Sequence, residues 1–242
     1  LHVSDDMGDT WKIISPDLTT NDKSKQTQAE SGGLSMDNSG AENHTTIFTI
    51  AESPIDENVI WVGTDDGNVQ LTTDGGKSWK NLTSNINSVP DNTWVYHIEP
   101  SVHDVGTAYV VFDGHTTGDM NPYALKTDDF GMNWKNIIPS NDVYGFTRSI
   151  QEDYENPDLL FLGTEFGLYI SINGGGTWNK FEKNVPPVAI HHIELQKFAH
   201  YFPLVSRFQK LFFDMFPLQY VMGVYQHQLL HLQMHVTLYN IH

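Results

Sequence analysis

The chain has 242 residues, of which 39% are hydrophobic, 12% aromatic and only 18% charged, a composition that favours a turn-rich all-β protein over a helical bundle. Its net charge of −17 makes nucleic acid and anionic membranes poor partners, because an acidic surface repels phosphate groups. The absence of cysteine excludes disulfides, thiolate metal sites and a cysteine nucleophile.

The first predicted element, residues 1–14, is the end of a repeat and contains the segment Ser-Asp-Asp-Met-Gly-Asp-Thr-Trp at positions 4–11. The same pattern returns at residues 72–79, 127–134 and 171–178, with Ser or Thr first, Asp or Asn third, Gly fifth and Trp eighth. We call each copy a box. The intervals between boxes are near or above the roughly 40–50 residues of a propeller blade.

Each box is predicted to be the turn of a β-hairpin. Its Asp or Asn can accept hydrogen bonds from backbone N–H groups one or two residues on, its Gly permits a positive φ, and its Trp can cover the hairpin. Because a turn needs the same side chains in every repeat, these residues are predicted to be structural rather than catalytic. They are Asp6, Gly8 and Trp11; Asp74, Gly76 and Trp79; Asp129, Gly131 and Trp134; and Asn173, Gly175 and Trp178.

A polar loop is predicted over residues 18–43, followed by three full repeats at 45–82, 94–138 and 147–181 and by the first strand of another at 188–196. Each full repeat predicts four consecutive strands. A four-stranded meander cannot bury both of its faces alone, but radially stacked meanders can. Residues 1–197 are therefore predicted to form a partial β-propeller of four-stranded blades. The alternative, a β-sandwich, does not explain why the same turn returns at the same place in every repeat.

Residues 198–242 differ in composition, being apolar and rich in His and Gln, and no further box follows Lys197. The hypothesis for this tail is out-of-frame sequence, with irregular or helical structure. His227, His231 and His235 are four residues apart and would share one face of a helix, but we expect no metal site and no cofactor.

The boxes, together with the segments 61–70, 107–115 and 161–168, resemble the secreted bacterial Asp-box (BNR-repeat) propellers, which are often labelled sortilin-like or glycosyl-hydrolase-like. The resemblance covers residues 1–197. It implies a propeller that is secreted, periplasmic or on the cell surface and that belongs to a larger protein. It also implies a Gly-Thr-His-Gly-Arg-Gly type of turn after Lys197, which this sequence lacks.

Candidate binding residues lie in the turns after the second strand of each blade, which a meander places at the end opposite the boxes. These turns carry Asp65, Asp66, Asp113, His115, Glu165 and Phe166. Acidic side chains in exposed turns also serve solubility. A sialidase, which holds its substrate with several arginines, is excluded for this fragment because the propeller portion contains only Arg148.

The sequence therefore predicts an extracytoplasmic binding module for protein, peptide or glycan. The alternative is a glycoside hydrolase acting on a neutral polysaccharide, which needs two carboxylates at a fixed separation. Neither nucleic-acid binding nor membrane insertion is expected, and the sequence does not identify catalytic residues.

Overall fold

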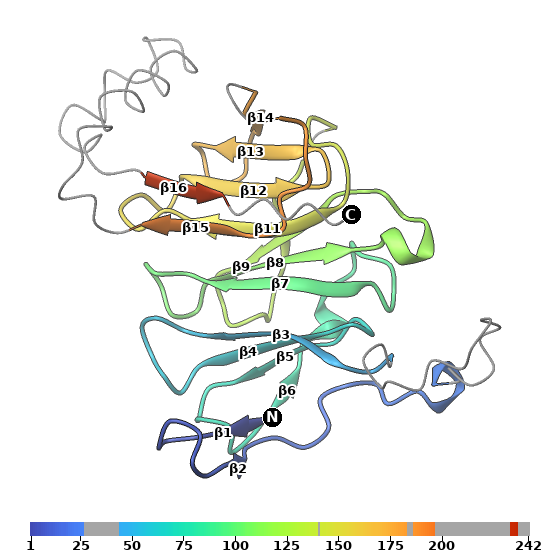
Figure 1. The fold of residues 1–242 in the computed structure, drawn as a ribbon, viewed down its shortest axis with the longest axis vertical. Coiled ribbons are helices and arrows are strands. Elements are labelled where there is room, and N and C mark those ends of the chain that lie inside the picture. Colours follow the sequence, from blue (N-terminus) through green and yellow to red (C-terminus); the bar gives the residue numbers. More distant parts are fainter. Residues whose placement is uncertain (27–43, 140, 183–185, 197–232, 237–242) are drawn as a thin grey trace.

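The computed structural model of the chain describes residues 1–26, 44–139, 141–182, 186–196 and 233–236 (Figure 1). Three four-stranded antiparallel sheets dominate it, and in each the strands neighbour one another in chain order. Blade 1 consists of β3 (Ile47–Glu52), β4 (Ile60–Thr64), β5 (Val69–Thr72) and β6 (Lys80–Asn81). Blade 2 consists of β7 (Trp94–Pro100), β8 (Ala108–Asp113), β9 (Tyr123–Thr127) and β10 (Lys135–Asn136). Blade 3 consists of β11 (Thr147–Glu152), β12 (Leu160–Thr164), β13 (Gly167–Ser171) and β14 (Asn179–Lys180). The predicted four-stranded blades are confirmed.

Two-stranded sheets flank the blades. The hairpin of β1 (His2–Val3) and β2 (Lys12–Ile13) lies next to blade 1, and β15 (Ile193–Gln196) pairs with β16 (Gln233–Val236) beside blade 3 (Figure 1). The helical alternative for the tail does not hold at β16, because His235 lies in an extended strand. His227 and His231 lie outside the described residues, as does the predicted domain boundary at Lys197, which stays a prediction.

Short 3-10 helices, and no α-helix, occur in the described part of the chain; they are Lys23–Lys25, Thr83–Asn85 and His115–Thr117. No helix among these residues is long and apolar enough to cross a membrane.

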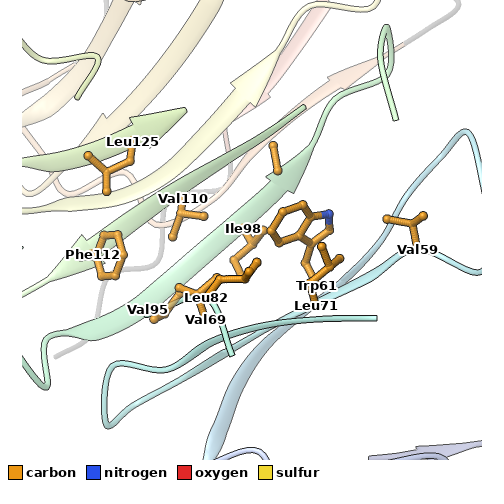
Figure 2. Close-up of a cluster of buried hydrophobic side chains, with 11 residues drawn as sticks. Val59, Trp61, Val69, Leu71, Leu82, Val95, Ile98, Val110, Phe112 and Leu125 are labelled. Carbon is orange, nitrogen blue, oxygen red and sulfur yellow. The ribbon is translucent and has the colours of Figure 1, made fainter. Parts of the chain in front are cut away.

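The blades are stacked along the long axis of the molecule, and their first strands β3, β7, β11 and β15 contact one another in sequence (Figure 1). Side chains from facing sheets fill the space between blades. The hydrophobic cluster between blades 1 and 2 includes Trp61, Val95 and Ile98, all almost fully buried (Figure 2). Equivalent clusters separate blade 2 from blade 3 and blade 3 from β15. This stacking of meanders about their first strands is the predicted partial propeller.

Each box forms the hairpin turn between the third and fourth strands of its blade, or between β1 and β2. The side chain of Asp74 accepts hydrogen bonds from the backbone N–H and the hydroxyl of Ser78, at 2.9 and 2.6 Å, while the Thr72 hydroxyl accepts one from Gly76 N–H at 2.9 Å. The two bonds from Ser78 are the main reason why the pKa of Asp74 is lowered to about 2. The acid thus reaches the residue four positions on, not one or two as predicted, because left-handed glycines curl the turn back.

The tryptophans of the boxes join neighbouring blades. The indole N–H of Trp79 donates to the Ile14 carbonyl at 2.8 Å, and that of Trp178 donates to the Ile137 carbonyl at 2.7 Å. Trp11 in the first box is 63% exposed and donates to Gly8 of its own turn. The boxes of Trp79 and Trp178 therefore serve two purposes, since each closes a hairpin and also hydrogen-bonds to the segment that precedes its blade.

Candidate functional site

The first strands of the three blades share an irregularity at one position. Strand pairing in each blade skips one residue, and the skipped residues are Phe48 in β3, Tyr96 in β7 and Arg148 in β11. A bulge re-aims the side chain of its extra residue. Residues 190–194, Ile-His-His-Ile-Glu, repeat residues 95–99, Val-Tyr-His-Ile-Glu, so His191 stands at the equivalent position before β15. We call these four residues the axial set.

The axial set converges where the first strands meet. The Phe48 and Tyr96 rings are 5.2 Å apart between centroids, and the Arg148 guanidinium lies over the Tyr96 ring at 4.9 Å. Arg148 also donates to the Tyr96 hydroxyl at 3.0 Å, and that hydroxyl lies 3.2 Å from Nδ1 of His191. Burial and the nearby Arg148 cation lower the pKa of His191. Three blades and the segment before β15 thus contribute one side chain each to a single cluster.

Trp94 and Phe146 extend the cluster with aromatic surface. Trp94, at the start of β7, lies 5.4 Å from Phe48 between ring centroids, and Phe146, just before β11, faces the Arg148 guanidinium at 4.7 Å. Phe48 itself is 43% exposed although it occupies an inner strand. The axial set is therefore an aromatic surface open to solvent with one cation built into it.

Asp113 and His115 stand beside this surface on the turn after β8. Asp113 is fully buried, and its Oδ1 accepts hydrogen bonds from the backbone N–H of His115 at 2.9 Å and from its Nδ1 at 2.7 Å. The His115 ring stacks on Phe146 with centroids 4.8 Å apart. Because a carboxylate only accepts, Nδ1 of His115 carries the hydrogen of this bond, and Nε2 is left to contact a ligand. Its side chain is 36% exposed, which leaves the ring edge open to a ligand.

Arg148 connects the two turns that carry the predicted acids of blades 2 and 3. Its guanidinium lies 3.5 Å from Oδ2 of Asp113 and 3.9 Å from Oε2 of Glu165. Oδ2 of Asp113 and Nε of Arg148 are buried and make no hydrogen bond within the described residues. The structure therefore brings together Asp113, His115 and Glu165 from the sequence prediction, around an arginine that the prediction did not place in the site.

The other predicted residues have different surroundings. Both Asp65 and Asp66 are buried and hold segments that precede blade 1: Asp65 accepts from the backbone N–H of Thr45 and Thr46, and Asp66 accepts from Thr20, as well as from Thr64 of β4. Phe166 is 46% exposed on the neighbouring turn, where it packs over Gly145. The carboxylates of Asp65 and Asp66 therefore both have partners within the protein.

A second group of polar side chains lies further along the inner strands, towards the boxes. Gln151 of β11 donates to the carboxyl of Glu99 in β7, and Nε2 of His97 is 3.9 Å from the same carboxyl. Burial raises the pKa of Glu99 to about 8 and lowers the pKa of His97 to about 4. At neutral pH both side chains are therefore uncharged.

Comparisons with known proteins agree with the fold. No protein-family model matches the sequence, and no curated protein matches it. A GH74 xyloglucanase from Xanthomonas campestris is 19% identical, with a TM-score of 0.53, over 76% of this chain and 27% of that one. A GH74 enzyme of Niastella koreensis is 20% identical over 71% of this chain and 24% of that one, with a TM-score of 0.47. YCF48 from Cyanidioschyzon merolae is 24% identical over 55% of this chain and 36% of that one, with a TM-score of 0.42.

This chain thus spans between about a quarter and a third of the length of these solved structures. At such identities a structural likeness speaks for the fold alone and carries no residue assignment or activity. The described sheets and the likeness to the xyloglucanase together show that the chain is part of a β-propeller.

Proposed function

We propose that the chain is an extracytoplasmic propeller module that binds a protein, peptide or glycan through the axial set and the adjoining turns. One observation carries this proposal: the bulge positions of the three blades bring Phe48, Tyr96 and Arg148 together, with His191 beside them, in a cluster in which Phe48 is 43% exposed. Bulges occur preferentially next to functional sites, and a buried core has no need of a half-exposed phenylalanine on an inner strand. The extracytoplasmic location rests on the family resemblance of the boxes.

The composition of the site suits recognition. Aromatic rings supply contact area at low entropic cost, while Nε2 of His115 and the carboxylate of Glu165 offer hydrogen-bonding groups at the rim. Asp113 and the rings of Phe146 and Trp94 hold His115 in place, so its orientation is fixed before a ligand arrives.

The proposal can be tested by titrating the chain with cello-oligosaccharides, xyloglucan oligosaccharides and short peptides of basic, acidic or neutral composition. The measurements are tryptophan fluorescence and the melting temperature. A ligand of this site should lose about tenfold or more in affinity on Phe48→Ala, in the range of an aromatic hot spot. Trp11→Ala, which removes an exposed aromatic side chain at the box end, is the control and should leave the affinity unchanged. Equal effects of the two variants would contradict the proposal.

A glycoside hydrolase is the second candidate, and Glu99 favours it. A general acid must be protonated at working pH, and the raised pKa of about 8 gives Glu99 that form at neutrality. Release of reducing ends from xyloglucan, abolished by Glu99→Gln with oligosaccharide affinity retained, would support this activity. Loss of hydrolysis on Asp113→Asn or Glu165→Gln would instead point to the turn carboxylates.

A further inference from the structure

We propose that the ligand of the axial set is a basic peptide segment, whose lysine or arginine side chain lies against the Phe48 and Trp94 rings with Glu165 at the rim. This inference rests on the proposed binding function and names the ligand class for the same site. It follows from the charge of the site, from its aromatic surface and from the net charge of the whole chain.

The charges within the site do not balance. The Asp113 and Glu165 carboxylates share Arg148 as their cation, at 3.5 and 3.9 Å. Oδ1 of Asp113 accepts from His115, while its buried Oδ2 has the ion pair with Arg148 and no hydrogen bond in the described part of the chain, so one arginine serves two carboxylates. Anionic ligands would meet an excess of negative charge, whereas an ammonium or guanidinium group would reduce it.

The aromatic surface already accepts a cation from the protein itself. Arg148 lies 4.9 Å from the Tyr96 ring and 4.7 Å from the Phe146 ring, within the usual range of cation–π contacts. Among the described residues, no cation is paired in this way with Phe48 or Trp94, although their ring centroids are only 5.4 Å apart and Phe48 is 43% exposed. The Phe48 and Trp94 rings therefore provide a second aromatic surface for a cation, beside the one that Arg148 occupies.

The net charge of −17 acts over a longer range and in the same direction. Oppositely charged partners are attracted before contact, which raises the association rate at low ionic strength. A neutral glycan gains nothing from this field. The charge, both local and global, therefore favours a basic peptide over an oligosaccharide.

The experiment uses a fluorescein-labelled decapeptide of alternating Gly and Lys and measures anisotropy with the full chain. Its counterparts are the same peptide with Glu in place of Lys and cellohexaose as an unlabelled competitor. The Lys peptide should bind, the Glu peptide should not, and cellohexaose should fail to displace the Lys peptide. Raising the salt concentration from about 0.05 to 0.2 M should weaken binding severalfold, since the Debye length falls to about 8 Å near physiological ionic strength.

Three variants separate specific binding from general attraction to an acidic protein. Phe48→Leu keeps apolar bulk but removes the ring and should weaken binding about threefold to thirtyfold, whereas Phe48→Tyr should leave it nearly unchanged. Glu165→Gln should weaken binding about twofold to fivefold, as expected for a partly exposed pair. Glu57→Gln removes the same charge from an exposed position at the box end and is the matched control.

The outcomes distinguish this inference from the proposed function. Equal effects of Glu165→Gln and Glu57→Gln, or full binding by Phe48→Leu, would overturn the basic-peptide inference. If cellohexaose binds and Phe48→Ala abolishes that binding, the ligand class is wrong while the site stands. If Phe48→Ala changes the binding of neither probe, both proposals fail.

Discussion

At the scale of single residues, Glu99 predicts a pH dependence of stability. Its pKa is raised from an ordinary value of 4.5 to about 8 by burial, so between these values the folded chain binds more protons than the unfolded chain. The free energy of unfolding must therefore fall as pH rises through this interval, by at most about 1.4 kcal/mol per pH unit. Glu99→Gln cannot ionise and still accepts the hydrogen bond from Gln151.

Urea unfolding between pH 6.5 and 8 checks this prediction. His97, whose pKa is lowered to about 4 in the folded chain, keeps its ordinary value of 6.5 in the unfolded chain and adds stability as pH rises through this interval, but the contribution is common to both proteins and cancels in their difference. We expect the wild-type chain to lose up to about 2 kcal/mol relative to Glu99→Gln as pH rises, following the limit per pH unit. Parallel pH profiles for the two proteins would show that Glu99 titrates normally.

At the scale of structural elements, the buried box tryptophan is predicted to be a contact between blades. Trp178 is buried and donates to the Ile137 carbonyl of the preceding blade at 2.7 Å, so Trp178→Phe leaves that carbonyl without its donor. The free energy of unfolding should fall by about 1–3 kcal/mol, the usual effect of an unpaired buried polar group.

Trp11→Phe is the matched substitution for this prediction, because Trp11 has the same place in its box but is 63% exposed. Its effect should stay within about 0.5 kcal/mol, as for most surface changes. Urea midpoints of both variants provide the measurement. A Trp178→Phe chain as stable as Trp11→Phe would mean that the boxes close hairpins without joining blades.

The elements also show how far the sequence alone could lead. The boxes and four-stranded repeats were predictable because turn chemistry is local: Thr72, Asp74 and Gly76 form the turn with a few neighbours. The candidate site was predictable only in part, because its axial position carries a different side chain in every blade and has no repeated residue. The sequence does carry one sign of the site, the similarity of residues 190–194 to residues 95–99. It becomes visible only when the first strands of the repeats are aligned with one another. The bonds from Asp65 and Asp66 to residues far along the chain gave no signal in the sequence.

At the scale of the whole molecule, the acidic surface should make stability depend on salt. A net charge of −17 on a chain of 242 residues repels itself most strongly when the chain is compact. Raising the ionic strength from about 0.01 to 0.15 M shortens the Debye length from about 30 to 8 Å and screens most of this repulsion. The melting temperature should rise, by about 2–4 °C for each kcal/mol gained at this chain length.

Comparison of sodium chloride with choline chloride, by differential scanning calorimetry, separates screening from specific ion binding. Screening depends only on ionic strength, so its contribution to the melting temperature should be the same in both salts. The axial set adds a further expectation, because choline is a quaternary ammonium ion that aromatic rings recognise. If Phe48 and Trp94 take a cation as proposed, choline should stabilise the wild-type chain more than sodium does. This additional stabilisation by choline should disappear in Phe48→Leu, whereas the rise in melting temperature that both salts cause should remain.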